Sequence, residues 1–519
     1  MDTNFYDVVV CGGEIGGLIA GALLARRGFR VMVLGHEPAL AAFEAGGTTL
    51  SAAPALLPSI DDPPTARVLK ELDVTAHVKR KTATADPAFR LLLPGQRLDI
   101  VRDPAQQERE LARAFGAAGG SVAAVMERLR AASRLLDPLF ASAITLPPNG
   151  FWERREVGRL RSLLPRPTTD LFAPLPLEHP FRAMAASPAI HGAAAVAHDV
   201  GPICEARAFD VARRGEYSLE GGLAALQAML FARLELFGAD RRERLTPAEV
   251  VVRRGRVAGI RVRPRDETIG CHHLLWAGSA AGLAAALAPD AVAPHKRPAA
   301  PRVTGYRYGI AALVEPDALG ADLPPRVLAI GDPARPLSED NAVAITVGQP
   351  SPRDPRQIPI WIECSVPAHL VEAGPSYLRA LRGRVTHVMR RLLPDFARHM
   401  IVLSSPYDGL PAEHRGTPVP ETTPPAVLPT IAPPALVGPP PQRPLDIVGL
   451  PHATAVKNLY LVGRENLPGL GLEGALISGW GVARLFGPGP ARKHLSPRRM
   501  QIGGRAPVPS PREAGRGLG

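Results

Sequence analysis

A buried strand, a glycine cluster and a helix follow one another at the start of the chain. Residues 7–11 form an apolar run, residues 12–17 read Gly-Gly-Glu-Ile-Gly-Gly, and residues 18–27 have helical spacing. A second apolar run at residues 31–34 completes a β-α-β unit. This order predicts an α/β fold that begins as a doubly wound parallel sheet.

The glycine cluster has nearly the spacing of a turn that holds a dinucleotide pyrophosphate. Gly12 and Gly17 occupy the first and sixth positions, which a tight turn and close helix packing reserve for glycine. Glu14 occupies the third position, where a carboxylate opposes a phosphate. The acid expected after the second strand is replaced by Gly35, and the nearest carboxylate is Glu37. The candidate cofactor-binding residues here are Gly12, Gly13, Glu14, Ile15, Gly16, Gly17 and Glu37. The same cluster also fits a strand-to-helix turn without a ligand, with Glu14 and Glu37 as ordinary solvated carboxylates.

A second glycine-rich turn lies near the C-terminus. Residues 458–462 predict a strand that ends at Gly463-Arg464, residues 468–474 read Pro-Gly-Leu-Gly-Leu-Glu-Gly, and residues 475–485 predict a helix. In order and spacing this segment resembles the flavin-dependent amine oxidase and phytoene desaturase superfamily, and within it the phytoene desaturase-like, NAD(P)/FAD-dependent members. Residues 221–223 resemble the middle flavin-domain segment of that family. The resemblance implies further cofactor contacts at Gly463, Arg464, Gly469, Gly471, Leu472, Glu473 and Gly474.

The resemblance implies a Rossmann-like FAD-binding domain, with a doubly wound parallel sheet, interleaved with an α+β substrate domain. The expected parts are FAD-binding segments at 1–84, 216–300 and 446–487, a helical part of the substrate domain at 85–215, substrate-domain strands, a helix and a proline-rich loop at 301–445, and a disordered basic tail at 488–519. It also implies an FAD-dependent oxidoreductase that moves hydride between the flavin and a lipophilic, isoprenoid-like substrate. No side chain is singled out as catalytic.

Four residues depart from the pattern of the family at positions expected to touch FAD: Glu14, Gly35, Thr48 and Arg464. Glu37 could reach the ribose instead, and Arg464 could contact a phosphate or pair with Glu473 at the helix start. The departures keep open a second hypothesis, in which a flavin-free protein of this fold binds a lipid or prenyl group, as Rab escort proteins do.

The distribution of charge along the chain argues against a nucleic-acid-binding protein. The 519 residues are 46% hydrophobic and carry a formal charge of +12 from 61 basic and 49 acidic residues. Residues 488–519 hold seven basic residues against Glu513, a net of 7 − 1 = +6, so half of the excess lies in the tail. The remaining charge forms no basic patch with interleaved aromatic residues, which argues against nucleic-acid binding. Contact of the tail, or of a basic helix at 377–393, with a membrane surface stays an expectation.

The cysteines and the N-terminal segment favour a reduced, cytoplasmic protein. Cys11, Cys204, Cys271 and Cys364 are widely spaced and form no paired motif. The residues before the first strand show no basic region or apolar signal core, and no apolar run reaches the length of a membrane helix. The run Cys271-His272-His273 is expected on a strand, where neighbours point to opposite faces, so we expect no metal site there.

Overall fold

This computed structural model describes residues 5–35, 42–52, 56–164, 166, 169–194, 196, 199–242, 244–288, 292, 301–320, 323–350, 354–372, 374–419, 433–438 and 445–487. Glu37, the tail at 488–519 and most of the proline-rich segment at 418–444 lie outside the described residues.

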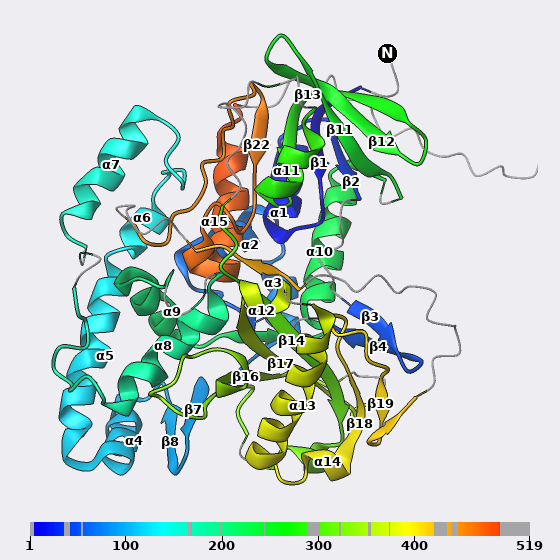
Figure 1. Cartoon of the computed structure of the whole chain (residues 1–519). Helices are drawn as coiled ribbons and strands as arrows, with labels where there is room; N and C mark the ends of the chain where they lie inside the picture. Colours follow the sequence, from blue (N-terminus) through cyan, green and yellow to red (C-terminus); the bar gives the residue numbers. More distant parts are fainter. Residues whose placement is uncertain are drawn as a thin grey trace, which may run out of the picture.

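The first sheet is built from three separated parts of the chain. Its order is β10-β2-β1-β13-β12-β11, with β22 also paired to β13. Strands β10, β2, β1, β13 and β22 run parallel, while β11, β12 and β13 form an antiparallel meander. The bounds are β1 (Phe5–Cys11), β2 (Val31–Leu34), β10 (Asp240–Arg242), β11 (Thr246–Arg253), β12 (Arg256–Arg263), β13 (Glu267–Trp276) and β22 (Leu459–Leu461). The predicted α/β fold with a parallel sheet is confirmed (Figure 1).

Three helices cover one face of this sheet: α1 (Ile15–Arg26), α10 (Gly222–Leu236) and α15 (Gly471–Arg484). Helix α1 is buried from Ile15 to Ala25, because its small residues let neighbouring segments approach closely. A Cβ at Gly21 would lie 3.2 Å from Val10 of β1 and 3.3 Å from Leu234 of α10. Strands β1 and β22 both run parallel to β13 in the first sheet. The N-terminal and C-terminal glycine turns, which follow these two strands, therefore lie at the same edge of the sheet.

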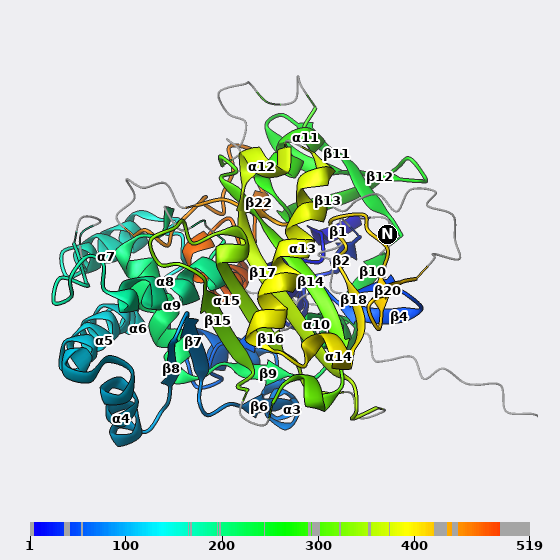
Figure 2. The same cartoon turned by 60° about the horizontal axis from the view of Figure 1, so that its bottom comes forward.

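The second sheet is mostly antiparallel and lies below the first in Figure 1. Its order is β20-β19-β18-β14-β17-β16-β15-β7-β8, with β21 paired to β14. The bounds are β7 (Phe89–Leu93), β8 (Gln96–Ile100), β14 (Gly305–Val314), β15 (Arg326–Ile330), β16 (Ala342–Val347), β17 (Ile358–Pro367), β18 (Met400–Ser404), β19 (Glu413–His414), β20 (Thr417–Pro418) and β21 (Ala435–Leu436). Helix α13 (Pro375–Leu392) packs across it through Leu378, Leu381, Val385 and Met389 (Figure 2).

Helices from residues 104 to 214 form a block beside the second sheet (Figure 1). They are α4 (Pro104–Phe115), α5 (Gly119–Arg134), α6 (Asp137–Ala141), α7 (Phe151–Arg161), α8 (Pro180–Gly192) and α9 (Pro202–Arg214). We predicted this region to be mostly helical, which holds for these six helices. Strands β7 and β8 were missed, although they form a local antiparallel hairpin across Pro94-Gly95; β7 also pairs in parallel with β15, more than 200 residues away along the chain.

The remaining elements are short and connect the larger layers. They are β3 (Ala42–Ala45), β4 (Thr48–Ser51), β5 (Leu56–Leu57), α2 (Pro63–Glu71), α3 (Thr75–Lys81), β6 (Thr82–Thr84), η1 (Gly116–Ala118), β9 (Tyr217–Leu219), α11 (Ala280–Ala286), η4 (Pro316–Ala318), η5 (Glu339–Asn341), α12 (Ala368–Glu372), α14 (Phe396–His399) and η6 (Pro468–Leu470). Among the described residues, no helix combines the length and the apolarity needed to span a membrane.

Candidate functional site

The N-terminal glycine turn joins β1 to α1 in the conformation that its glycines require. Gly12 has φ +113°, and a Cβ there would collide with the carbonyl oxygen of Ala277, the residue that follows β13. A Cβ at Gly17 would likewise collide with the side chain of Ala277. Both glycines therefore perform the packing roles that the sequence predicted for the first and sixth positions.

The start of α1 offers backbone donors to an anion. Ile15, Gly16 and Gly17 are buried, and Glu14 at the N-cap makes no capping hydrogen bond with its side chain. Among the described residues, no other side chain accepts a hydrogen bond from these N–H groups, and a Cβ on Gly13 would meet no atom within 4 Å. A buried helix start with unpaired N–H groups and a positive dipole end suits a phosphate or a carboxylate.

The carboxylate of Glu14 lies at this turn, close to Gly463 and Arg464. Its Oε1 lies 3.6 Å from Nε of the Arg464 guanidinium. A Cβ on Gly463 would collide with the Glu14 carboxylate. Glu14 is therefore partly buried: its side chain is 21% exposed, and burial raises the pKa of its carboxyl despite the opposing effect of Arg464.

Two buried polar residues hold the turn that follows β22. The N–H of Gly463 donates to Oδ1 of Asn466 at 2.9 Å and to Oγ of Ser478 at 3.0 Å, and Asn466 donates to the carbonyl oxygen of Leu450 at 3.0 Å. Asn466 and Ser478 are fully buried. Both lie inside the segment that carried the family resemblance, but nothing in their residue type marked them as supports of the Gly463 backbone.

Glycines in the C-terminal segment permit close packing around η6 and the start of α15. Gly471 has φ +56°, and a Cβ there would collide with the carbonyl oxygen of Gly192 in α8. A Cβ on Gly469 would lie 2.7 Å from the Cα of Ile447. The segment from Gly469 to Gly474, which includes Leu472, thus lies directly against the helical block.

Glu473 pairs with Arg207 of α9, so the predicted pair between Glu473 and Arg464 is wrong. The guanidinium of Arg207 contacts the Glu473 carboxylate at 2.5 and 3.0 Å, and it also contacts Asp137 at 2.6 Å. Arg464 contacts Glu14 instead. The sequence could not indicate Arg207, because it lies 266 residues from Glu473 in a helix without a recognisable motif.

Arg207 is part of a larger network of buried charges. Arg214, about two turns further along α9, bridges Asp137 at 3.0 Å, Asp62 at 2.9 Å and Asp210 at 2.6 Å. Asp62 stands before α2, and Asp137 opens α6. The network therefore ties α9 to the start of α15 and to two other elements, and it fixes the position of the C-terminal turn.

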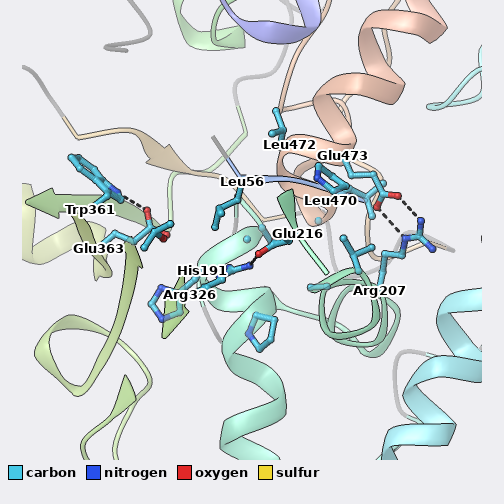
Figure 3. A pocket seen from close by; sticks show the side chains of 18 of the residues that line it. Leu56, His191, Arg207, Glu216, Arg326, Trp361, Glu363, Leu470, Leu472 and Glu473 are labelled. Atoms are coloured by element: carbon cyan, nitrogen blue, oxygen red, sulfur yellow. Dashed lines mark hydrogen bonds and ion pairs between the residues drawn. The ribbon is translucent and has the colours of Figure 1, made fainter. Parts of the chain in front are cut away.

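A cavity of about 250 Å³ opens where α8, α9 and the start of α15 face strands β15 to β17 (Figure 3). Its lining includes Leu56, His191, Arg207, Glu216, Arg326, Trp361, Glu363, Leu470, Leu472 and Glu473. A second cavity of about 420 Å³ is lined by Thr48, Gly221, Gly222 and apolar residues of β14 and β17. Thr346 and Trp361 line both cavities, so the two spaces adjoin at these side chains.

The charged side chains around the first cavity are mostly paired with one another. Figure 3 shows the ion pair of Arg326 with Glu216 and the pair of Arg207 with Glu473. The Glu363 carboxylate accepts the indole N–H of Trp361 at 3.0 Å. No cationic side chain among the described residues forms an ion pair with Glu363, although Arg307 lies close enough for the two charges to interact.

His191 contributes a neutral imidazole to the cavity wall. Burial, reinforced by the nearby guanidinium groups of Arg307 and Arg326, lowers the pKa of His191 well below its usual range. Its Nδ1 has no hydrogen-bond partner among the described residues. The Glu363 carboxylate, which forms no ion pair with any described residue, is a polar group of the lining that a substrate could engage.

The other departures from the family pattern fall at separate places. The N–H of Gly35, after β2, donates to the carbonyl oxygen of Arg242 at 3.2 Å. Thr48 begins β4 and lines the second cavity. Glu37 lies outside the described residues, so its suggested contact with a ribose stays a prediction.

Comparison with known proteins establishes the fold. No family model matches the chain, and no curated protein matches its sequence. An oxidoreductase from Methanosarcina mazei matches with a TM-score of 0.58 and 15% identity, covering 92% of this chain and all of that one. The cyclohexylamine oxidase of Brevibacterium oxydans matches with a TM-score of 0.52 and 13% identity, covering 92% and 98% of the two chains. The chain has the fold of these oxidoreductases. At such identities the likeness concerns the fold alone, and it singles out no phytoene desaturase-like relationship.

Proposed function

We propose that this chain is an FAD-dependent oxidoreductase of the phytoene desaturase-like type that acts on a lipophilic substrate. The observation that carries the proposal is the buried start of α1, whose N–H groups find no side-chain partner among the described residues. An arrangement of this kind is stabilised by an anionic ligand. The fold supports the proposal, because matching structures with TM-scores above 0.5 include proteins described as an oxidoreductase, a cyclohexylamine oxidase and a putrescine oxidase.

The two glycine turns would hold FAD along the edge of the first sheet. Gly12, Gly13, Ile15, Gly16 and Gly17 would face the pyrophosphate, with Gly463 and Arg464 beside them; Gly469, Gly471, Leu472, Glu473 and Gly474 would border the flavin end. The Glu473 side chain is already engaged by Arg207, so this residue would contribute through its backbone. When bound, FAD supplies two-electron redox chemistry, and the protein supplies position and shielding.

Glu14 is the one residue of the turn whose described position conflicts with a pyrophosphate. Its carboxylate lies beside the Arg464 guanidinium and fills the space beside Gly463. Two anions in one buried place repel each other, so binding of FAD would require Glu14 to turn outward or to take up a proton. The pKa of Glu14 is already raised by burial, which lowers the cost of protonation.

The cavity beside the start of α15 supports an apolar substrate. Most of the charged side chains in its lining are paired with each other. The rest of the lining consists largely of aliphatic, aromatic and small side chains, including Leu56, Val211, Leu470 and Leu472. The adjoining second cavity, with Ala311, Leu313 and Ile360 in its wall, gives an elongated molecule additional room. Glu363 would orient a polar group of the substrate.

A reducing location such as the cytoplasm fits the cysteines. All four are buried, and none forms a disulfide. Free cysteines are usual where glutathione keeps thiols reduced.

The second candidate is a flavin-free protein that binds a lipid or prenyl group in the same cavities. The contact of Glu14 with Gly463 and Arg464 favours it, because this chain then provides its own anion at the turn. The two proposals share the apolar cavity and differ in whether the edge of the first sheet takes up FAD.

Reduction of bound flavin under anaerobic conditions tests the oxidoreductase proposal and its substrate class together. We expect an isoprenoid lipophile delivered in detergent to bleach the flavin absorbance, or the reduced flavin to be reoxidised by its desaturated counterpart. If cyclohexylamine or putrescine bleaches the flavin absorbance, and this bleaching is lost in Glu363→Gln, the substrate is an amine and not a lipophile. A protein that takes up FAD but reacts with none of these compounds would contradict the proposed substrate class, whereas absence of FAD uptake would contradict the whole proposal.

A further inference from the structure

The exposed face of α7 carries large aromatic side chains on the outside of the protein. Phe151 is 71% exposed and Trp152 is 69% exposed, and Leu163, just after the helix, is 65% exposed. These are three of the six large hydrophobic side chains that stand exposed in the described part of the chain. Figures 1 and 2 both place α7 at the outer edge of the helical block. The neighbouring aromatic rings of Phe151 and Trp152, exposed in such a place, mark an interaction surface.

Helical geometry separates this face from the side of α7 that packs inward. Successive residues turn by about 100°, so Phe151, Arg155 and Arg159 fall on one side together with Trp152. Val157, on the opposite side, is buried against Leu139, Leu164 and other residues of the block. We call the outward side, with Phe151, Trp152, Arg155 and Arg159, the outer face of α7. All four of its residues are exposed.

The start of α7 is anchored, so the aromatic pair is held in place. The Glu153 carboxylate accepts backbone N–H groups of Thr145 at 3.1 Å, Asn149 at 2.8 Å and Gly150 at 3.0 Å. The rings of Phe151 and Trp152 meet edge to face, with their centroids 5.5 Å apart. The exposure of these rings is therefore a property of the folded helix.

Helix α7 as a whole is positively charged, with Arg154, Arg155, Arg159 and Arg161 against Glu153 and Glu156, a net of 4 − 2 = +2. Two of these arginines, Arg155 and Arg159, lie on the outer face, and the other two lie nearer the side of Val157. Glu153 is engaged by backbone N–H groups, and Glu156 pairs with Arg159. Arg154, Arg155 and Arg161 form no ion pair with any described residue, and the Arg155 guanidinium lies over the Trp152 ring at 5.7 Å.

We propose that the outer face of α7 docks on an anionic lipid bilayer. Phe151 and Trp152 would enter the boundary between headgroups and acyl chains, where aromatic rings are favoured, and the arginines would contact lipid phosphates. Positive charge next to the bilayer adds attraction to acidic lipids. The sequence favoured the tail or the helix now described as α13; the latter exposes Arg379, His387 and Arg390 but none of the exposed large hydrophobic side chains. This proposal holds whether or not the protein binds FAD.

Tryptophan fluorescence reports on this face selectively. The chain has four tryptophans, and Trp276, Trp361 and Trp480 are 1%, 4% and 6% exposed, so Trp152 alone is accessible to lipid. We expect vesicles that contain phosphatidylserine and brominated acyl chains to quench the emission of the full-length protein. Trp152→Phe should abolish the quenching while leaving binding in place. Phosphatidylcholine vesicles should quench much less, because they lack the negative charge.

Co-sedimentation with the same vesicles separates the aromatic from the basic contribution. Phe151→Ser with Trp152→Ser, and separately Arg155→Gln with Arg159→Gln, should each weaken binding about tenfold at low salt. Leu236→Ser is the matched control, because Leu236 is 67% exposed at the end of α10, and it should bind like the wild type. Unquenched emission with anionic vesicles, or unchanged binding of the Phe151 and Trp152 variant, would overturn the proposal. Retention of a protein partner through this face without any vesicle binding would overturn it as well.

Discussion

The carboxylate of Glu14 fills the space that a side chain at position 463 would occupy, so the two glycine turns of the first sheet meet at this contact. Gly463 follows β22 and Glu14 follows β1, and the Arg464 guanidinium lies beside the same carboxylate. Under the proposed function, this acidic side chain would stand beside the pyrophosphate of FAD.

Replacing Glu14 should strengthen FAD binding. Glu14→Gly removes both the charge and the side chain, and Glu14→Gln removes the charge alone, so we expect affinity to rise about tenfold or more in the first and less in the second. Titration of FAD, followed by its fluorescence, measures the change. Glu178→Gln, at an exposed carboxylate of the helical block, is the control and should leave affinity unaltered. Equal affinity in all four proteins would show that Glu14 does not lie beside the pyrophosphate.

FAD affinity should also depend on pH through Glu14. Burial raises the carboxyl pKa in the free protein, and a neighbouring pyrophosphate would raise it further. Binding then takes up a proton, so affinity is highest at pH values below the pKa of free Glu14 and falls as pH rises through it. The slope should vanish in Glu14→Gln. A wild-type affinity that rises with pH would have the wrong sign for this account.

Adjacent glycines should respond differently to substitution. Gly12→Ala forces a side chain into a positive φ and against the carbonyl oxygen of Ala277, so we expect a loss of about 2 kcal/mol or more in the free energy of unfolding. Gly13→Ala places its methyl group in open space and should change stability by less than about 0.5 kcal/mol. Urea denaturation compares the two. Similar losses at both positions would contradict the described turn.

Replacing Arg207 should lower the free energy of unfolding more than replacing most residues outside the glycine turns. Arg207→Ala leaves the buried Glu473 carboxylate unpaired and takes a partner from Asp137, which should cost about 3 to 5 kcal/mol of unfolding free energy. Arg261→Ala removes a more exposed pair with Glu249 and should cost less than about 1 kcal/mol. Chemical denaturation of both variants measures the difference, and equal losses would argue against a buried network.

A pair of acids near the start of α9 should make the protein less stable as pH rises. Burial raises the pKa of Glu205 to about 7 and that of Asp446 to about 6. A raised carboxyl pKa means that the neutral form is favoured in the folded state, so the stabilisation is full below about pH 4 and is lost as the pH rises to about 7. We expect a decrease of about 2 kcal/mol over this window, smaller in Glu205→Gln. Stability that increases across the window would contradict the assignment.

The local parts of the site were predictable from sequence, and the long-range parts were not. The strand, turn and helix from Phe5 to Arg26 follow directly from an apolar run, glycines and helical spacing. The contacts of Glu14 with Arg464 and of Glu473 with Arg207 join residues hundreds of positions apart, so their charges alone did not define the partners. Strands β7 and β8 were missed although they form a local hairpin, because the Pro94-Gly95 turn between two apolar runs was passed over in a region predicted to be helical.

FAD titration of the purified wild-type protein by isothermal calorimetry, after removal of any bound nucleotide, tests the central claim most directly. The account predicts saturable binding of one FAD per chain, tighter in Glu14→Gly, and a bound cofactor with flavin absorbance bands. A folded protein that shows no binding heat and no flavin absorbance, in both the wild type and Glu14→Gly, would contradict it.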